Sequence, residues 1–349
     1  MPYIYPQSVT AMQIEQDLIQ RGREGRIGLD LMPPVNRNAA KVRWTQKDNY
    51  YGLAQMRGYD GSPLKVDRVR SNTYEYSPGV FGEFIALDEE ELTTRAGAID
   101  LNLIPIDVGD MIAEIQIQLI GREFDRMEAS IWTLLTTGVL KITQDGPNGK
   151  QQTLSDSYTI QTYTAPIPWS TSNTSTPIRD LQAVQQLGQA AGHSVNFGTG
   201  AVAYCNGVTA FRLLNNNNNL DYGGRRTMNG STINSLPTAN TYFGGQGLAE
   251  LKIYDAGYVP YRAGVGFKKF IPDGVVVLVG QRTSGAKIGE YQLTRNLSNN
   301  LNPGSYTFTK DYANGVNAPK EVPGKIEVHR GHNGGPAIYY PSAVMVMTV

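Results

Sequence analysis

The residue types that most often carry chemistry are sparse in this sequence, and their spacing does not favour a reactive site. His329 and His332 form an H-x-x-H pair, a spacing at which two rings on a helix can hold a metal ion. Glycines follow the pair closely, and no cysteine or third histidine lies near it in the sequence. We therefore predict that these two histidines bind no metal.

Three further features also argue against catalysis. The segment Gly198–Ala203 is similar to the dinucleotide-binding fingerprint, but it precedes an apolar β-type run instead of joining a strand to a helix. Asp88 to Glu91 are consecutive, so their carboxylates alternate between faces and do not converge on a substrate. The single cysteine, Cys205, lies in an apolar run that we predict to be buried and inert. We predict no catalytic residue, no cofactor and no metal, and hence a protein that is not an enzyme.

Composition argues against several further classes of function. Lys+Arg and Asp+Glu both number 31, so the formal charge is zero, which argues against binding nucleic acid by neutralising its phosphates. Zero net charge permits self-association, because copies do not repel one another at long range. The sequence contains neither a long apolar run nor a signal-peptide pattern, so we expect no membrane span and no secretion. A lone cysteine cannot form an intrachain disulfide, which is typical of a reducing compartment.

One long amphipathic helix organises the predicted structure. We place it over residues 107–137, with Asp107 as N-cap and Gly138 at its end. At 1.5 Å per residue the helix would be about 45 Å long. Apolar residues in steps of three and four predict one buried stripe, with a polar face opposite. The predicted stripe is Ala113, Ile117, Ile120, Phe124, Met127, Ile131 and Leu134, and the predicted polar face is Glu114, Gln118, Arg122, Glu123 and Arg126.

The remainder is predicted to be strands, loops and short helices. Residues 1–40 are typical of an arm that docks on another surface. Residues 41–97 alternate polar and apolar residues between glycine-rich breaks, which predicts a protruding two-stranded loop. A helix should start at Thr176, which is followed by proline. The asparagine tract Asn215–Asn219 should be an exposed loop, and the apolar end Ala343–Val349 a strand paired within a sheet.

The predicted two-stranded loop has a basic stretch and an acidic stretch. Two interpretations remain open: these charges are solvated edges, or they meet a neighbouring subunit. A lone two-stranded hairpin is only marginally stable in water, which favours a partner surface. The basic stretch contains Lys65, Arg68 and Arg70, and the acidic stretch contains Asp88, Glu89, Glu90 and Glu91.

The order of these parts resembles the major capsid proteins of tailed bacteriophages, and more closely the lambda-type (major capsid protein E) family. The resemblance extends from about residue 40 to residue 349, and it rests on the order and spacing of four segments. These segments are Val69–Gly79, Met127–Thr143, Pro168–Ser170 followed by Pro177–Leu181, and Phe270–Gly274 followed by an apolar strand over 275–280.

This resemblance implies an α+β chain with the Hong Kong-97-type phage capsid fold. The implied parts are an N-terminal arm, an extended loop, a peripheral domain built on the long helix, an axial domain, and a last strand that returns to the peripheral domain. Their expected boundaries are 1–40 for the arm, 41–97 for the loop, 98–194 and 195–336 for the two domains, and 337–349 for the strand.

The implied function is that of a major capsid protein. Its copies would form hexamers and pentamers of an icosahedral shell around double-stranded phage DNA. A scaffolding protein, a portal and a decoration protein are the implied partners, with only weak non-specific contact to DNA and no membrane. The implied location is the virion, after assembly in the host cytoplasm. The expected intersubunit contacts are the charged loop residues named above together with Arg122, Glu123 and Arg126.

Two other classes of structural protein remain open. One is a non-viral compartment with the same fold, which encloses enzymes instead of DNA. The other is a β-rich tail or fibre protein.

Overall fold

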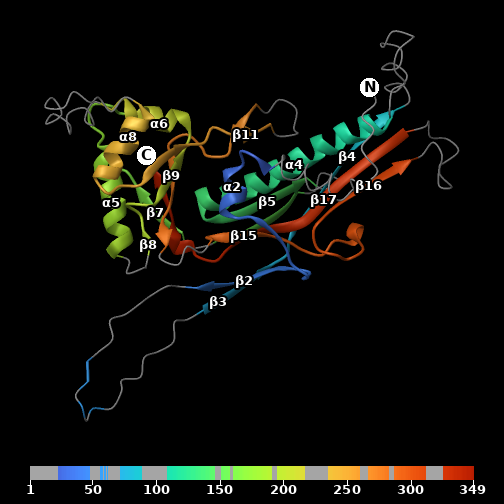
Figure 1. Ribbon diagram of the computed structural model, residues 1–349, viewed down its shortest axis with the longest axis horizontal. Coiled ribbons are helices and arrows are strands. Elements are labelled where there is room, and N and C mark those ends of the chain that lie inside the picture. The colour runs from blue at the N-terminus through green and yellow to red at the C-terminus, as the bar shows by residue number, and fades with distance from the viewer. Residues whose placement is uncertain are drawn as a thin grey trace, which may run out of the picture. The chain divides into compact units, whose positions relative to one another are not determined.

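The described residues of the computed structural model fall into two compact units (Figure 1). The first unit draws on Met1–Val42, Ser77–Glu128 and Tyr291–Gly335, and the second on Arg43–Tyr76, Ala129–Glu290 and Pro336–Val349. The structure describes residues 23–47, 56–57, 59, 61, 71–88, 108–145, 151–157, 160–190, 195–216, 235–259, 266–282, 287–311 and 325–349.

Helix α4 (Val108–Thr137) confirms the predicted long helix. It ends at Gly138, whose φ of 68° is the left-handed conformation that glycine adopts readily. The N–H of Gly138 donates to the carbonyl of Leu134 at 2.9 Å and completes the last turn. The predicted N-cap, Asp107, lies outside the described residues. No helix within the described ranges is long and apolar enough to cross a membrane.

The buried stripe of α4 agrees with the prediction from Ile120 to Leu134 but not before it. Ala113 and Ile117 are exposed, and Ile117 exposes 52% of its surface. Apolar residues are crowded in the first three turns, so two different rows satisfy helical spacing, and the prediction selected the wrong one. The row that is buried there consists of Met111, Ile115 and Leu119, which cluster with Leu87 and Val328.

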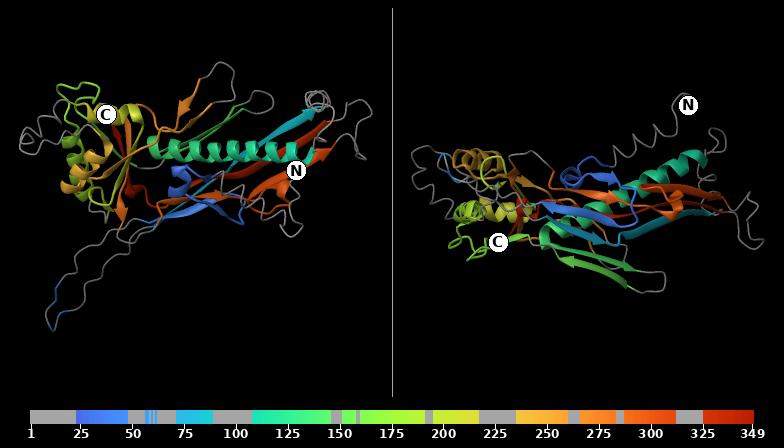
Figure 2. Two further views of the ribbon diagram at one scale, coloured as in Figure 1. Left: turned by 45° about the horizontal axis from the view of Figure 1, so that its top comes forward. Right: turned by 90° about the horizontal axis from the view of Figure 1, so that it is seen from below.

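The first unit is built on a five-stranded sheet whose central strand is β17 (Lys325–Ile338). Strand β4 (Gly79–Asp88) pairs with β17 in antiparallel register, with Asp88 opposite Lys325. Strand β16 (Ser305–Asp311) pairs antiparallel to β17 on its other side. The sheet continues through β15 (Gly289–Leu293) to β1 (Pro34–Asn36). Helix α4 lies along one face of the β4–β17–β16 strands (Figure 2).

The described part of the predicted N-terminal arm binds its own chain, contrary to the expectation that it docks elsewhere. The carboxylate of Glu128 accepts hydrogen bonds from the N–H groups of Gly28 (2.7 Å) and Leu29 (2.9 Å), at the start of helix α2 (Ile27–Leu31). Arg26 donates to Asp125 through two nitrogens, at 3.0 and 2.7 Å. Strand β1 then adds in parallel to β15. Residues 23–36 are therefore an integral part of the first unit.

A second five-stranded sheet forms the centre of the second unit. The predicted C-terminal strand is confirmed as β18 (Val344–Thr348), which pairs antiparallel to β13 (Val275–Val279) and parallel to β7 (Gln161–Thr164). Strands β9 (Val202–Cys205) and β10 (Glu250–Ile253) complete the sheet. Among its described residues this unit contains the last turns of α4 and the helices α5 (Pro177–Ala190), α6 (Gly207–Leu214) and α8 (Leu236–Gly245).

Two local predictions in the second unit have different outcomes. Cys205 is confirmed as a core residue: it is fully buried, and burial together with the nearby charge of Asp255 raises the pKa of its thiol to about 12, which disfavours the reactive thiolate. The asparagine tract is not wholly exposed. Asn216 is fully buried and donates to the hydroxyl of Ser175 at 2.6 Å, while 217–219 lie outside the described residues.

The remaining strands form short pairs. Strands β2 (Val42–Lys47) and β3 (Ser71–Tyr76) pair where the two-stranded loop was predicted, and Trp44 stacks on Tyr74 with ring centroids 5.5 Å apart. The other pairs are β5 (Val139–Asp145) with β6 (Gln151–Ser157), β8 (Val195–Asn196) with β14 (Gln281–Arg282), and β11 (Gly257–Tyr258) with β12 (Lys268–Lys269). Two 3-10 turns, η2 (Leu297–Asn299) and η3 (Pro341–Ala343), precede β16 and β18.

Candidate functional site

The two histidines of the H-x-x-H pair do not converge. They lie on β17, where residues three positions apart point to opposite faces of the sheet. His329 contacts Glu327, with 2.9 Å between Nε2 and Oε2. His332 lies on the face that meets α4, near Glu123. Among the residues that the structure describes, no group of three or more His, Cys, Asp or Glu side chains could hold a metal ion.

A buried ionic cluster joins α4 to the sheet of the first unit. Its centre is Glu123 of α4, whose Oε2 accepts from Nε of Arg330 at 2.5 Å. The other carboxylate oxygen accepts from the hydroxyl of Ser305, also at 2.5 Å. It also lies 2.9 Å from Nδ1 of His332. Glu123, Arg330 and His332 are all buried.

The outer members of the cluster hold the strand side chains in place. Arg330 donates from Nη1 to the hydroxyl of Thr307 on β16 at 2.6 Å. The ring of His332 meets the hydroxyl of Tyr291 on β15 at 3.0 Å. We call Glu123, Tyr291, Ser305, Thr307, Arg330 and His332 the ionic cluster. It connects one helix with three strands of the sheet.

The prediction that Glu123 lies on the exposed polar face of the helix is therefore wrong. The helical pattern alone cannot reveal a charge that is neutralised inside the fold by residues more than two hundred positions later in the chain. A signal was nevertheless present on β17. The residues of β17 that face α4 are first apolar, Ile326 and Val328, and then ionisable, Arg330 and His332. Ionisable residues on a buried strand face indicate that an oppositely charged partner lies opposite them.

The cluster controls the ionisation of Glu123. Burial alone would raise the pKa of this carboxyl group, but the contact with His332, the charge of Arg330 and the hydroxyl of Ser305 outweigh burial and lower the pKa to about 2. The ordinary value is 4.5, so the ionised form is favoured in the folded state. A pKa that is lower in the folded than in the unfolded chain stabilises the fold when the group is ionised.

We expect this contribution to be lost on acidification. It is fully present above about pH 4.5, declines as the pH falls from there to about 2, and amounts to about 3 kcal/mol. Urea unfolding of the unassembled chain at several pH values within this window measures it. Other carboxylates titrate in the same range, so the Glu123→Gln variant is the reference. If the variant loses stability with acid as steeply as the original chain, the assignment of the low pKa to Glu123 is wrong.

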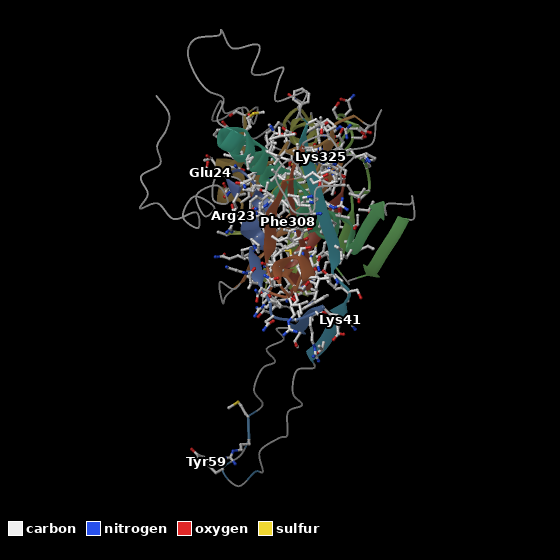
Figure 3. The ribbon with its side chains drawn as sticks, turned by 90° about the vertical axis from the view of Figure 1, so that its right-hand side faces the viewer. Arg23, Glu24, Lys41, Tyr59, Phe308 and Lys325 are labelled. Atoms are coloured by element: carbon white, nitrogen blue, oxygen red, sulfur yellow. The ribbon has the colours of Figure 1, made fainter. Side chains whose placement is uncertain are left out.

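The opposite face of the sheet carries a row of stacked rings. Phe84 of β4, His329 of β17 and Phe308 of β16 lie in direct register. The ring centroids are 5.0 Å apart for Phe84 and His329, and 4.7 Å apart for His329 and Phe308. Figure 3 labels Phe308, together with Lys325 from the neighbouring strand. Cross-strand pairing within the sheet accounts for this row, so we assign it a structural role.

The predicted contact residues that the structure describes lie on α4 and β4. Asp88 is exposed at the end of β4. Arg122 forms two hydrogen bonds with Glu83 of the same chain, at 2.5 and 3.0 Å, and both side chains are about half exposed. The guanidinium of Arg126 lies over the ring of Phe81, 4.8 Å from its centroid. The other predicted contacts, Lys65, Arg68, Arg70, Glu89, Glu90 and Glu91, lie outside the described residues.

Known proteins match this chain in structure but not in sequence. No protein-family model and no curated protein matches the sequence. A solved structure assigned as the capsid protein of a prophage in E. coli CFT073 has a TM-score of 0.55 at 12% identity, over 96% of this chain and 98% of that chain. A phage-related protein from Bordetella bronchiseptica RB50 has a TM-score of 0.52 at 10% identity, over 95% and 96% of the two chains. Similarity at such low identity establishes the fold alone, and the chain has the α+β fold of these phage-related proteins.

Proposed function

We propose that this chain is a phage major capsid protein, the structural subunit of a protein shell. The observation that carries the proposal is the end-to-end structural match to the prophage capsid protein, which covers nearly all of both chains. A match of this extent relates the whole fold rather than one widely shared motif. The order and spacing of the four sequence segments between residues 69 and 280 support the same proposal.

The finer assignment is a lambda-type member with the Hong Kong-97-type fold. In this proposal, hexamers and pentamers build an icosahedral shell that encloses double-stranded DNA, with a scaffolding protein, a portal and a decoration protein as partners. The proposed parts are still an arm, an extended loop, a peripheral domain, an axial domain and a returning strand, but residues 23–36 and strand β4 belong to the first unit and not to a separate arm or loop. The zero net charge supports close packing of copies and only weak contact with DNA.

Shell formation would depend on complementary surfaces rather than on a reaction. The acidic stretch from Asp88 to Glu91 is proposed to pair with basic residues of a neighbouring copy, with Lys65, Arg68 and Arg70 as candidates. Arg122 and Arg126 are proposed as further contacts from α4. An exposed ion pair contributes less than about 1 kcal/mol, but such pairs select register and recur at every subunit contact.

Electron microscopy tests this function. The chain, expressed with and without its neighbouring genes, should give closed shells tens of nanometres across in negative stain, and shells from phage-producing cells should protect double-stranded DNA from nuclease. Small oligomers or fibres would contradict the proposal and favour a tail or fibre protein. Shells filled with an enzyme instead of DNA would identify a non-viral compartment.

Neutralising the acidic stretch (Asp88→Asn with Glu89→Gln, Glu90→Gln and Glu91→Gln) should impair assembly, and unimpaired assembly would contradict the proposed contacts.

A further inference from the structure

One row of helix α4 faces β17 and is apolar except at a single position. The residues of this row are four positions apart: Met111, Ile115, Leu119, Glu123 and Met127, all of them buried. The facing row of β17 has a matching pattern, in which Ile326 and Val328 are followed by Arg330 and His332. The one charged residue of the helix row thus meets the charged part of the strand row.

The two rows have nearly the same repeat. Four residues of helix rise about 6 Å, and two residues of strand rise about 6.6 Å. Helix α4 and strand β17 run in the same direction along the sheet (Figure 1). A displacement of the helix by one step would therefore bring apolar side chains against apolar side chains again. Hydrophobic contact is non-directional and does not by itself exclude the displaced arrangement.

The ionic cluster distinguishes the two arrangements. A one-step displacement would place Leu119 or Met127 against Arg330 and would separate its guanidinium group from the Glu123 carboxylate. Arg330 is buried, so its guanidinium group would lose this partner without gaining water. A buried charge without a partner strongly disfavours the arrangement that contains it.

We propose that the ionic cluster sets the register of α4 on β17, and that this selection, rather than net stabilisation, is its role in the fold. Buried ion pairs often contribute no more stability than well-packed apolar residues of similar volume. Their best-attested role is to specify one arrangement among several, as a single buried polar residue does in a coiled coil. The ionic cluster has the same features: one polar position in an apolar row, with every partner on the facing surface.

The register of α4 also affects assembly, a step that rests on the proposed function. Every copy in a closed shell must present the same set of surfaces to its neighbours. A helix displaced by about 6 Å would carry its exposed residues, among them Ile117 and Arg122, to new positions. The ionic cluster would then select the one arrangement from which uniform shells form.

Distance measurements between spin labels test the register in the unassembled chain. Labels at Ile117→Cys on α4 and Lys310→Cys on β16 report the position of the helix, because both side chains are exposed. The buried Cys205 is replaced by alanine so that only two labels attach. The original chain should give one narrow distance distribution.

An apolar version of the cluster is the first variant. It combines Glu123→Met, Tyr291→Phe, Arg330→Met and His332→Leu, which leaves Ser305 and Thr307 within reach of water. We expect it to unfold at the same or a higher denaturant concentration than the original chain. Its distance distribution should contain a second population, displaced by up to about 6 Å. An unchanged single distance would overturn the proposal. A variant that fails to fold would overturn it too, because the cluster would then hold the fold together.

A second variant relocates the charge by one step, through Leu119→Glu combined with Glu123→Leu. We expect the main distance to change, by up to about 6 Å, even if the variant is less stable. The original distance would mean that other contacts set the register, and would contradict the proposal. Met127→Leu, which changes the same row without changing charge, is the matched control and should keep the original distance. Because the distances are measured without assembly, absence of shells would contradict the proposed function and leave this inference intact.

Discussion

Replacing Arg330 by methionine is expected to lower the free energy of unfolding of the unassembled chain by about 3–5 kcal/mol. The substitution keeps most of the side-chain volume but removes the guanidinium group that lies 2.5 Å from Glu123. The carboxylate stays buried and keeps only the hydroxyl of Ser305 and the contact with His332. Thr307 also loses the donor that Arg330 provides. A large loss of stability in Arg330→Met does not mean that the intact cluster adds much net stability. The variant leaves the Glu123 charge buried without its arginine, whereas replacing both partners by apolar residues would not.

The matched control is Arg122→Met. Arg122 also pairs with a glutamate, but both side chains are about half exposed, so its loss should cost less than about 1 kcal/mol. Urea unfolding of both variants at neutral pH measures the difference. In Arg330→Met the deficit should shrink on mild acidification, since Glu123 without its arginine is more easily protonated. Equal losses in the two variants would show that Arg330 and Glu123 are not the buried pair described above.

The features that the sequence predicts well are those determined by local pattern. Helix α4 begins at Val108 and ends at Thr137, within one residue of the predicted range, because a long periodic segment stops at a glycine. The C-terminal strand was predictable because an apolar run that ends a chain needs partners on both sides, and β18 has them. In both cases the residues that define the element lie within the element.

The features that the sequence does not predict depend on distant partners. Glutamate is a residue type that usually lies on the surface, and the partners of Glu123 lie about two hundred positions away in the sequence. Arg26 and Asp125 are 99 positions apart, and nothing in either local sequence indicates that they meet. The burial of the first turns of α4 is determined by where β4 and β17 lie, so helical periodicity alone selected Ile117 in place of Ile115. The sequence thus predicts elements, whereas the pairing of charges between elements requires the fold.

Gly331→Ala is expected to lower the free energy of unfolding by about 3 kcal/mol. Gly331 lies in the middle of β17, between β4 and β16. A Cβ atom there would overlap the carbonyl oxygen of Phe81 and would lie 2.7 Å from both Cα of Gly82 and the hydroxyl of Tyr306. The Tyr306 side chain can move, but the backbone of β4 cannot move away without weakening its hydrogen bonds with β17. The same two strands carry the face that packs on α4, so the cost extends beyond one contact.

Gly121→Ala is the matched control, because it makes the same substitution where the chain has space. Gly121 lies inside α4, and a Cβ atom there would meet nothing within 4 Å. Alanine favours a helix interior over glycine, so this variant should gain about 0.5–1 kcal/mol. Thermal or urea unfolding of the two unassembled variants should therefore give changes of opposite sign. If Gly331→Ala were as stable as the original chain, β4 and β17 would have to be further apart than the structure has them.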